Sequence, residues 1–192
     1  TEPGQKKWGS TDPFRGMKWS ALEGGTRVPC IIRYPEVIPS GKVSNKLTSA
    51  IDLLPTLAHA CGIELQEGSG IVPQMDGLNL WNSLRGKTKT HPRSNLLYFN
   101  GWATPQAIRV NEWKLYFDQI KEIKDSNLGP ILINMDMDPI ENVNRLKEFP
   151  SKVKSMQILA KKLLLEIEKN SIPLGGPTNP KKGSVKKAVW LK

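Results

Sequence analysis

Lys18 stands five residues ahead of a Glu-Gly-Gly turn, formed by Glu23, Gly24 and Gly25, in the stretch GMKWSALEGGTRVP. A loop lysine presents a compact positive charge with three hydrogen-bond donors, which suits a tetrahedral oxyanion such as sulfate or phosphate. The glycines let the backbone turn sharply, and Glu23 can anchor the loop by accepting hydrogen bonds. By physical chemistry alone, a solvated position on the surface is the commoner fate of a lysine. Both interpretations of Lys18 therefore stay open at this point.

The cysteines and histidines predict no further chemistry. Cys30 and Cys61 lie among apolar residues and outside any metal-binding spacing, which predicts two small buried side chains. His59 is expected on a helix and His91 in a loop before proline, and neither has a partner at metal-ligand spacing. We therefore predict no catalytic residue and no metal ligand in the chain.

The net charge of +10 over 192 residues is unevenly distributed. Six lysines and no acidic residue follow Glu168, so the rest of the chain is only mildly basic. A basic tail of this kind, residues 171–192, is typical of a solvated terminus rather than of a nucleic-acid-binding arm. No apolar run is long enough to cross a bilayer. We expect neither nucleic acid nor a membrane as a partner.

The first half of the chain is expected to supply one α/β unit. Residues 1–26 are rich in turn-forming residues, which predicts a long ordered loop. The apolar run 27–35, bounded by prolines, predicts a strand buried on both faces. Residues 49–63 predict a helix, with Asp52 as its cap and Pro55 in its first turn. Leu53, Leu54, Leu57, Ala58 and Cys61 fall at helical spacing along this segment.

The second half is expected to form a small antiparallel sheet covered by a helix. Strands are predicted within residues 94–100, 106–120 and 129–136, with a tight turn at Asn111-Glu112. A helix is predicted from about Pro150 to Asn170, and its apolar stripe comprises Val153, Met156, Leu159, Leu163 and Ile167. We expect this part to fold independently of the rest. The chain thus divides into an incomplete α/β portion (1–90), a compact α+β portion (91–170) and the basic tail (171–192).

The order of the motifs resembles the sulfatase family of the alkaline phosphatase superfamily. The segments that carry this resemblance are Lys18, Glu23-Gly24-Gly25, Arg27-Val28-Pro29, Tyr34-Pro35, Ser49, Asp52 to Leu57, Gly62, DGLNLWNSLRG, AIRVNEWKLYF and NMDMDPIENVNRL. Together they extend from residue 14 to about residue 170.

The resemblance implies a fold, a site and a cellular setting. The implied fold is α/β: part of an alkaline-phosphatase-like mixed sheet, followed by a small antiparallel sheet with a packed helix. By position, Lys18 matches the family lysine that contacts the sulfate group of the substrate, and Glu23, Gly24 and Gly25 shape its loop. The resemblance also implies calcium in the complete enzyme, a sulfated small molecule or glycan as substrate, and a periplasmic or secreted location.

Several family motifs are absent from these 192 residues. The nucleophile of a sulfatase lies in a Cys/Ser-x-Pro-x-Arg motif, and CIIR at Cys30 has neither the proline nor the spacing. The aspartates and the Asp-Asn pair that hold calcium in the family, and its catalytic histidines, have no counterpart here. We therefore expect the C-terminal portion of a sulfatase that is inactive alone and associates with the missing N-terminal portion or with a second copy.

Two alternatives to the sulfatase interpretation remain open from the sequence. A phosphonate or phosphodiester hydrolase of the same superfamily can share this architecture, because a lysine binds phosphate as readily as sulfate. A non-catalytic binding module would keep the small sheet and its helix, and its loop would carry no chemistry. A Cys/Ser-x-Pro-x-Arg motif in preceding sequence would favour the sulfatase.

Overall fold

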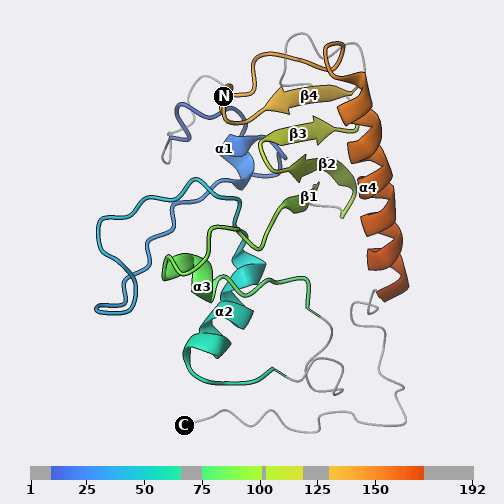
Figure 1. Cartoon of the computed structure of the whole chain (residues 1–192). Helices are drawn as coiled ribbons and strands as arrows, with labels where there is room; N and C mark the ends of the chain where they lie inside the picture. The colour runs from blue at the N-terminus through green and yellow to red at the C-terminus, as the bar shows by residue number, and fades with distance from the viewer. Residues whose placement is uncertain (1–9, 66–74, 101–102, 119–129, 171–192) are drawn as a thin grey trace, which may run out of the picture.

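The computed structural model describes residues 10–65, 75–100, 103–118 and 130–170, and its centre is a four-stranded antiparallel sheet (Figure 1). The strands follow one another in chain order: β1 (Asn95–Phe99), β2 (Pro105–Val110), β3 (Trp113–Tyr116) and β4 (Ile131–Asn134). The predicted strands are confirmed; residues 119–129, at the ends of two of the predicted segments, lie outside the described residues. The sheet forms because these segments combine β-branched and aromatic residues that pack well on a pleated surface.

The tight turn between β2 and β3 is confirmed at Asn111-Glu112. Val110 pairs with Trp113 across it, and Asn111 has a φ of +51°. Asparagine adopts this left-handed conformation more readily than most residues, so the sequence suits a two-residue hairpin turn here.

One face of the sheet is covered by α4 (Pro150–Asn170). Met156 and Ala160 of the helix are buried against a cluster from the sheet that includes Ile108, Leu115 and Leu132. The predicted helix is confirmed, and Val153, Leu159 and Leu163 pack on the same cluster. Ile167 is exposed instead, because the end of α4 extends past β1 (Figure 1).

The opposite face of the sheet is covered by the loop that leads into the one-turn helix α1 (Glu23–Thr26). Ala21 and Leu22 are fully buried there against Tyr98, Ala107 and other residues of the sheet. The prediction that the α+β part folds independently is therefore wrong, because its second core is completed by residues from the beginning of the chain. The division of the chain at residue 90 stays a prediction.

The other short helices are η1 (Ala50–Asp52), α2 (Leu53–Ala60) and α3 (Trp81–Leu84). The helix predicted in residues 49–63 is confirmed as η1 followed by α2. Its apolar stripe is not buried, since Ala58 is covered but Leu53, Leu54, Leu57 and Cys61 are exposed. None of the helices in the described ranges is both long enough and apolar enough to cross a bilayer.

The strand predicted at residues 27–35 does not form. Residues 27–34 belong to no strand of the described sheet, and the side chain of Ile31 is 94% exposed. Cys30 is exposed as well, so the prediction of two buried cysteines is wrong for both. A strand buried on both faces needs neighbouring strands and covering helices, and the described part of the chain provides none at this segment.

A buried ion pair ties α2 to the start of the sheet. The Arg93 guanidinium donates to both carboxylate oxygens of Asp52, at 2.8 and 2.5 Å, and to the carbonyl of Asp76 at 2.8 Å. The same carboxylate accepts the amide N–H groups of Ser49 and Leu78. Asp52 therefore joins three segments of the chain. It stands at the N-cap position of α2, as the sequence predicted, but its side chain makes no capping hydrogen bond to α2 and accepts the Ser49 amide at the start of η1 instead.

The Asp52–Arg93 pair predicts a specific loss of stability in acid. Burial raises the pKa of Asp52, but hydrogen bonds from Arg93, Leu78 and Ser49 outweigh it, so the pKa lies below the ordinary value. Its contribution to stability is then complete above the unfolded pKa of about 4 and is lost as pH falls through the folded value. The difference in unfolding free energy between the parent and Asp52→Asn should shrink between about pH 5 and pH 2. Denaturant titrations that give the same difference at both pH values would contradict this.

The exposed apolar residues of the first half predict association. Val28, Ile31, Leu54 and Leu57 are all more than half exposed, and large exposed apolar side chains in such number favour association. We expect the purified chain to sediment as larger species with rising concentration, and Ile31→Lys to reduce this. Ile158→Lys, at an exposed apolar residue of α4, is the matched control. A strictly monomeric parent at high concentration would refute the prediction.

Candidate functional site

Lys18 lies at the tip of a tight turn. The Ser20 amide donates to the Met17 carbonyl at 3.0 Å, which places Lys18 and Trp19 at the two central positions of the turn. Trp19 has a φ of +79°, as a type II turn requires of its third residue. Lys18 is exposed, and its ammonium lies 5.2 Å from the centroid of the Trp19 ring.

The backbone of Gly24 and Gly25 packs against the backbone of this turn. A Cβ atom on Gly25 would lie 2.3 Å from the Ser20 carbonyl oxygen and 2.5 Å from that of Met17. A Cβ on Gly24 would lie 2.5 Å from the Arg15 carbonyl oxygen. The backbone of the Lys18 turn therefore packs directly on the Gly-Gly backbone, which leaves no room for a side chain at either position.

Glu23 fixes the same segment to the sheet through a buried lysine. The Lys114 ammonium donates to the Ala21 carbonyl at 2.7 Å, to Glu23 Oε1 at 2.8 Å and to Glu141 Oε1 at 3.0 Å. Glu141 Oε2 in turn accepts the backbone N–H of Glu23 at 2.8 Å. Lys114 and Glu141 are fully buried and Glu23 is 3% exposed, so one ammonium is shared by two carboxylates away from water. We call Glu23, Lys114 and Glu141 the buried charge cluster.

Two tyrosines complete the surroundings of the buried charge cluster. The Tyr116 hydroxyl donates a short hydrogen bond to Glu141, and the Lys114 ammonium lies 4.5 Å from the centroid of the Tyr98 ring. Burial, together with the negative charge of Glu141, raises the pKa of Tyr116 far above its ordinary value. Burial and the charge of Glu23 likewise raise the pKa of Tyr98. Both phenols therefore stay protonated, and Tyr116 remains a donor to Glu141.

Arginines stand at the rim of this cluster. Guanidinium groups of Arg27 and Arg109 lie 3.9 and 4.0 Å from Glu23 Oε2. Arg15 donates to the backbone carbonyl of Glu141 at 3.2 Å and to the side chain of Asn142 at 3.0 Å. The loop that carries Lys18 is thus attached on both sides of the turn to the segment that follows β4.

The turn after β4 presents Glu141 to the cluster. Glu141 has a φ of +62°, a conformation that few residues other than glycine adopt without a compensating contact. The Asp138 carboxylate accepts the amides of Asn142 and Val143, both at 2.7 Å, and Asn144 Oδ1 accepts the amide of Leu132. These side-chain hydrogen bonds hold the turn in the shape that aims the Glu141 carboxylate inward.

The four residues predicted from the sequence, Lys18, Glu23, Gly24 and Gly25, lie on one loop. Glu23 accepts a hydrogen bond from Lys114, while the sulfate contact of Lys18 and the loop-shaping role of the other three stay predictions. No prediction from the sequence included Lys114 or Glu141. A signal for Lys114 was present, since it is a charged residue within the otherwise apolar run WKLYF.

The described histidines and acidic residues provide no metal site. His59 is exposed on α2, while the His91 ring lies 2.7 Å from the Leu47 carbonyl and 3.1 Å from the Ser83 hydroxyl. Within the described ranges, no three His, Cys, Asp or Glu side chains come together to hold a metal ion. The donor set for the calcium that the resemblance implies is therefore not found among these residues.

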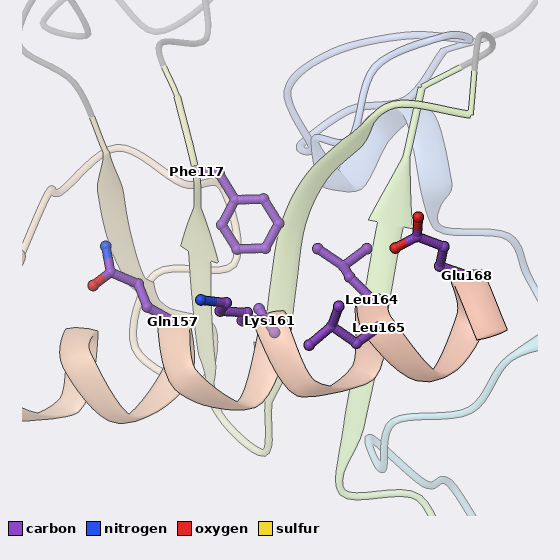
Figure 2. Close-up of a pocket in the computed structure, with 7 residues that line it drawn as sticks. Phe117, Gln157, Lys161, Leu164, Leu165 and Glu168 are labelled. Carbon is purple, nitrogen blue, oxygen red and sulfur yellow. The ribbon is translucent and has the colours of Figure 1, made fainter.

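A shallow apolar hollow lies beside α4, on the other side of the sheet from the Lys18 loop (Figure 2). Its lining comprises Phe117, Gln157, Ala160, Lys161, Leu164, Leu165 and Glu168. Since it contains neither Lys18 nor a member of the buried charge cluster, it is separate from the candidate site.

Comparisons with known proteins show similarity to sulfatases. Residues 4–63 match the family model described as Sulfatase. A sulfatase of Formosa agariphila is 30% identical over 203 aligned residues, which cover 94% of this chain and 35% of the relative. The steryl-sulfatase of Mus musculus is 35% identical over 118 residues, covering 59% of this chain and 18% of that protein. These matches support a sulfatase.

A solved structure supports the same interpretation. This structure, from work on the metabolism of multiple glycosaminoglycans by Bacteroides thetaiotaomicron, superposes with a TM-score of 0.60 at 29% identity. The match covers 78% of this chain and 32% of that one. The expected partial sulfatase fold, with its small antiparallel sheet and packed helix, is thereby confirmed. This chain spans about a third or less of the length of these sulfatases.

The buried charge cluster predicts a large cost for removing its cation. Lys114→Met leaves two buried carboxylates without their partner, and breaking such a pair destabilises proteins by about 3 to 5 kcal/mol. Chemical denaturation of the purified chain measures this loss. Lys154→Met, at an exposed lysine of α4, is the control and should change stability by less than about 0.5 kcal/mol. A loss of under about 1 kcal/mol for Lys114→Met would show that the cluster does not hold the loop.

Proposed function

We propose that this chain belongs to a sulfate ester hydrolase, in which Lys18 contacts the sulfate group of the substrate. The observation that carries the proposal is the mounting of Lys18: an exposed ammonium at the tip of a turn whose base is fixed to the sheet. A charge held in this way needs little reorganisation when an oxyanion arrives. Similarity to the sulfatase family supports the reaction class.

The proposed chemical role of Lys18 is charge stabilisation. Hydrolysis of a sulfate ester breaks a bond between sulfur and the ester oxygen, while the other sulfate oxygens keep their negative charge. An ammonium beside one of these oxygens stabilises the transition state by about 2 to 4 kcal/mol, on the scale of single preorganised donors. Lysine suits this position because it is a compact point charge, whereas the planar fork of arginine needs more room.

The proposal assigns the nucleophile to another part of the enzyme. These 192 residues contain no Cys/Ser-x-Pro-x-Arg motif. We therefore propose that the chain alone does not hydrolyse sulfate esters and acts together with a polypeptide that carries the nucleophile and the metal. We propose that this polypeptide covers exposed apolar side chains of the first half, among them Ile31 and Leu54.

The relatives share the sulfate ester but differ in the carrier, since one is a steryl-sulfatase and a similar structure comes from work on glycosaminoglycan metabolism. A lysine that meets sulfate oxygens would serve each of these carriers alike.

The test is a substitution of Lys18 in the complete enzyme. Lys18→Ala should lower kcat at saturating aryl sulfate by at least about 30-fold, the equivalent of about 2 kcal/mol. Lys18→Arg should recover only part of this rate. Lys42→Ala, at another exposed lysine of the first half, should leave kcat unchanged.

Two results would count against this function. A fall of less than about threefold in Lys18→Ala, which is less than 1 kcal/mol, would remove Lys18 from the sulfate site. Faster turnover of an aryl phosphodiester than of the aryl sulfate by the parent enzyme would instead identify a phosphodiester hydrolase of the same superfamily.

A further inference from the structure

Trp19 is held in an unusual way for a large side chain. Its φ of +79° is a backbone conformation that residues other than glycine rarely adopt, and its side chain is 70% exposed. Glycine would satisfy the turn without strain, and burial of the indole contributes little to the packing of the described part of the chain. Within the loop the indole contacts only the Lys18 ammonium among the interactions described above, which directs attention to what its exposed surface could bind.

The Trp19 ring and the Lys18 ammonium lie close together, which suits a ligand with both a ring and a negative charge. The ammonium lies 5.2 Å from the ring centroid, so the turn presents a positive charge and a flat apolar surface next to each other. An ester of sulfate on a ring has the complementary pair of features, a charged group attached to a flat or puckered apolar face. Tryptophan commonly supplies the face on which such rings pack.

We infer that Trp19 is a specificity-determining residue, whose indole stacks on the ring that carries the sulfate ester. This inference rests on the proposed function, because it needs the sulfate to lie at Lys18. Trp19 then provides affinity for the carrier, while Lys18 stabilises the charge on the sulfate oxygens in the transition state.

The experiment separates the ring from the sulfate by using two probes with the complete enzyme. The first is nitrophenyl sulfate, which has a ring, and the second is inorganic sulfate, which is tested as a competitive inhibitor and has none. Trp19→Gly should raise the KM for nitrophenyl sulfate at least about tenfold and leave the inhibition constant of inorganic sulfate within twofold. Trp19→Phe, which keeps a smaller flat ring, should raise this KM less.

Two measurements guard against a merely structural effect. Trp19→Gly relieves the positive φ, so the melting temperature should stay the same or rise. Met17→Ala alters a neighbouring side chain of the same turn, also exposed, and should change neither kinetic constant.

The outcomes distinguish this inference from the proposed function. If Lys18→Ala lowers kcat but Trp19→Gly leaves the KM for nitrophenyl sulfate unchanged, the stacking role of Trp19 is wrong and the sulfate contact stands. If Trp19→Gly lowers the melting temperature and raises the KM for nitrophenyl sulfate and the inhibition constant of inorganic sulfate equally, Trp19 anchors the loop against the rest of the enzyme. The inference is then again overturned. If Lys18→Ala has no effect on kcat, the proposed function fails, and the inference fails with it.

Discussion

The ammonium of Lys114 is out of contact with water, and its charge is balanced by carboxylates from two distant parts of the chain. A buried ion is tolerated only when its partners are fixed at close range, because desolvation costs more than a loose pair can return. Strand β3, the segment before α1 and the turn after β4 must therefore adopt one arrangement together. The position of the Lys18 turn depends on this arrangement, since the turn rests on the glycines that follow Glu23.

Several residues of the motifs that resemble the sulfatase family have a structural role in this fold, because they form the buried charge cluster. Glu23 comes from the Glu-Gly-Gly segment, Lys114 from the Trp-Lys pair, and Glu141 from the segment after Asp138-Pro139. Although they are far apart in the sequence, they meet in one cluster on the face of the sheet opposite α4. Among these motif residues, Lys18 differs, because it is held at the surface with its charge available to a ligand.

The two halves of the chain differ in how much of their core they contain. The sheet has both faces covered, by α4 on one side and by the loop around Leu22 on the other. Most large apolar side chains of residues 27–63 are exposed, although Ala58 of α2 and the Asp52 carboxylate are buried. The Asp52–Arg93 pair holds α2 near the sheet without covering its apolar face. Exposure of this apolar surface to water is unfavourable, and a partner that covered it would remove that free-energy cost.

The local sequence pattern determined most of the secondary structure in the second half of the chain. Alternating apolar residues, a two-residue turn at Asn111-Glu112 and a helical stripe specified the strands and α4, because each of these signals acts over a few residues. The role of Glu23 as an anchor also followed from its place beside two glycines. Exposure of Cys30 and Ile31 was not predictable in this way, since an apolar run indicates a strand but does not show whether the chain supplies its neighbours. Only the tertiary structure could reveal the partners of Lys114, because a lysine in a strand is buried or solvated according to which distant carboxylates the fold brings to it.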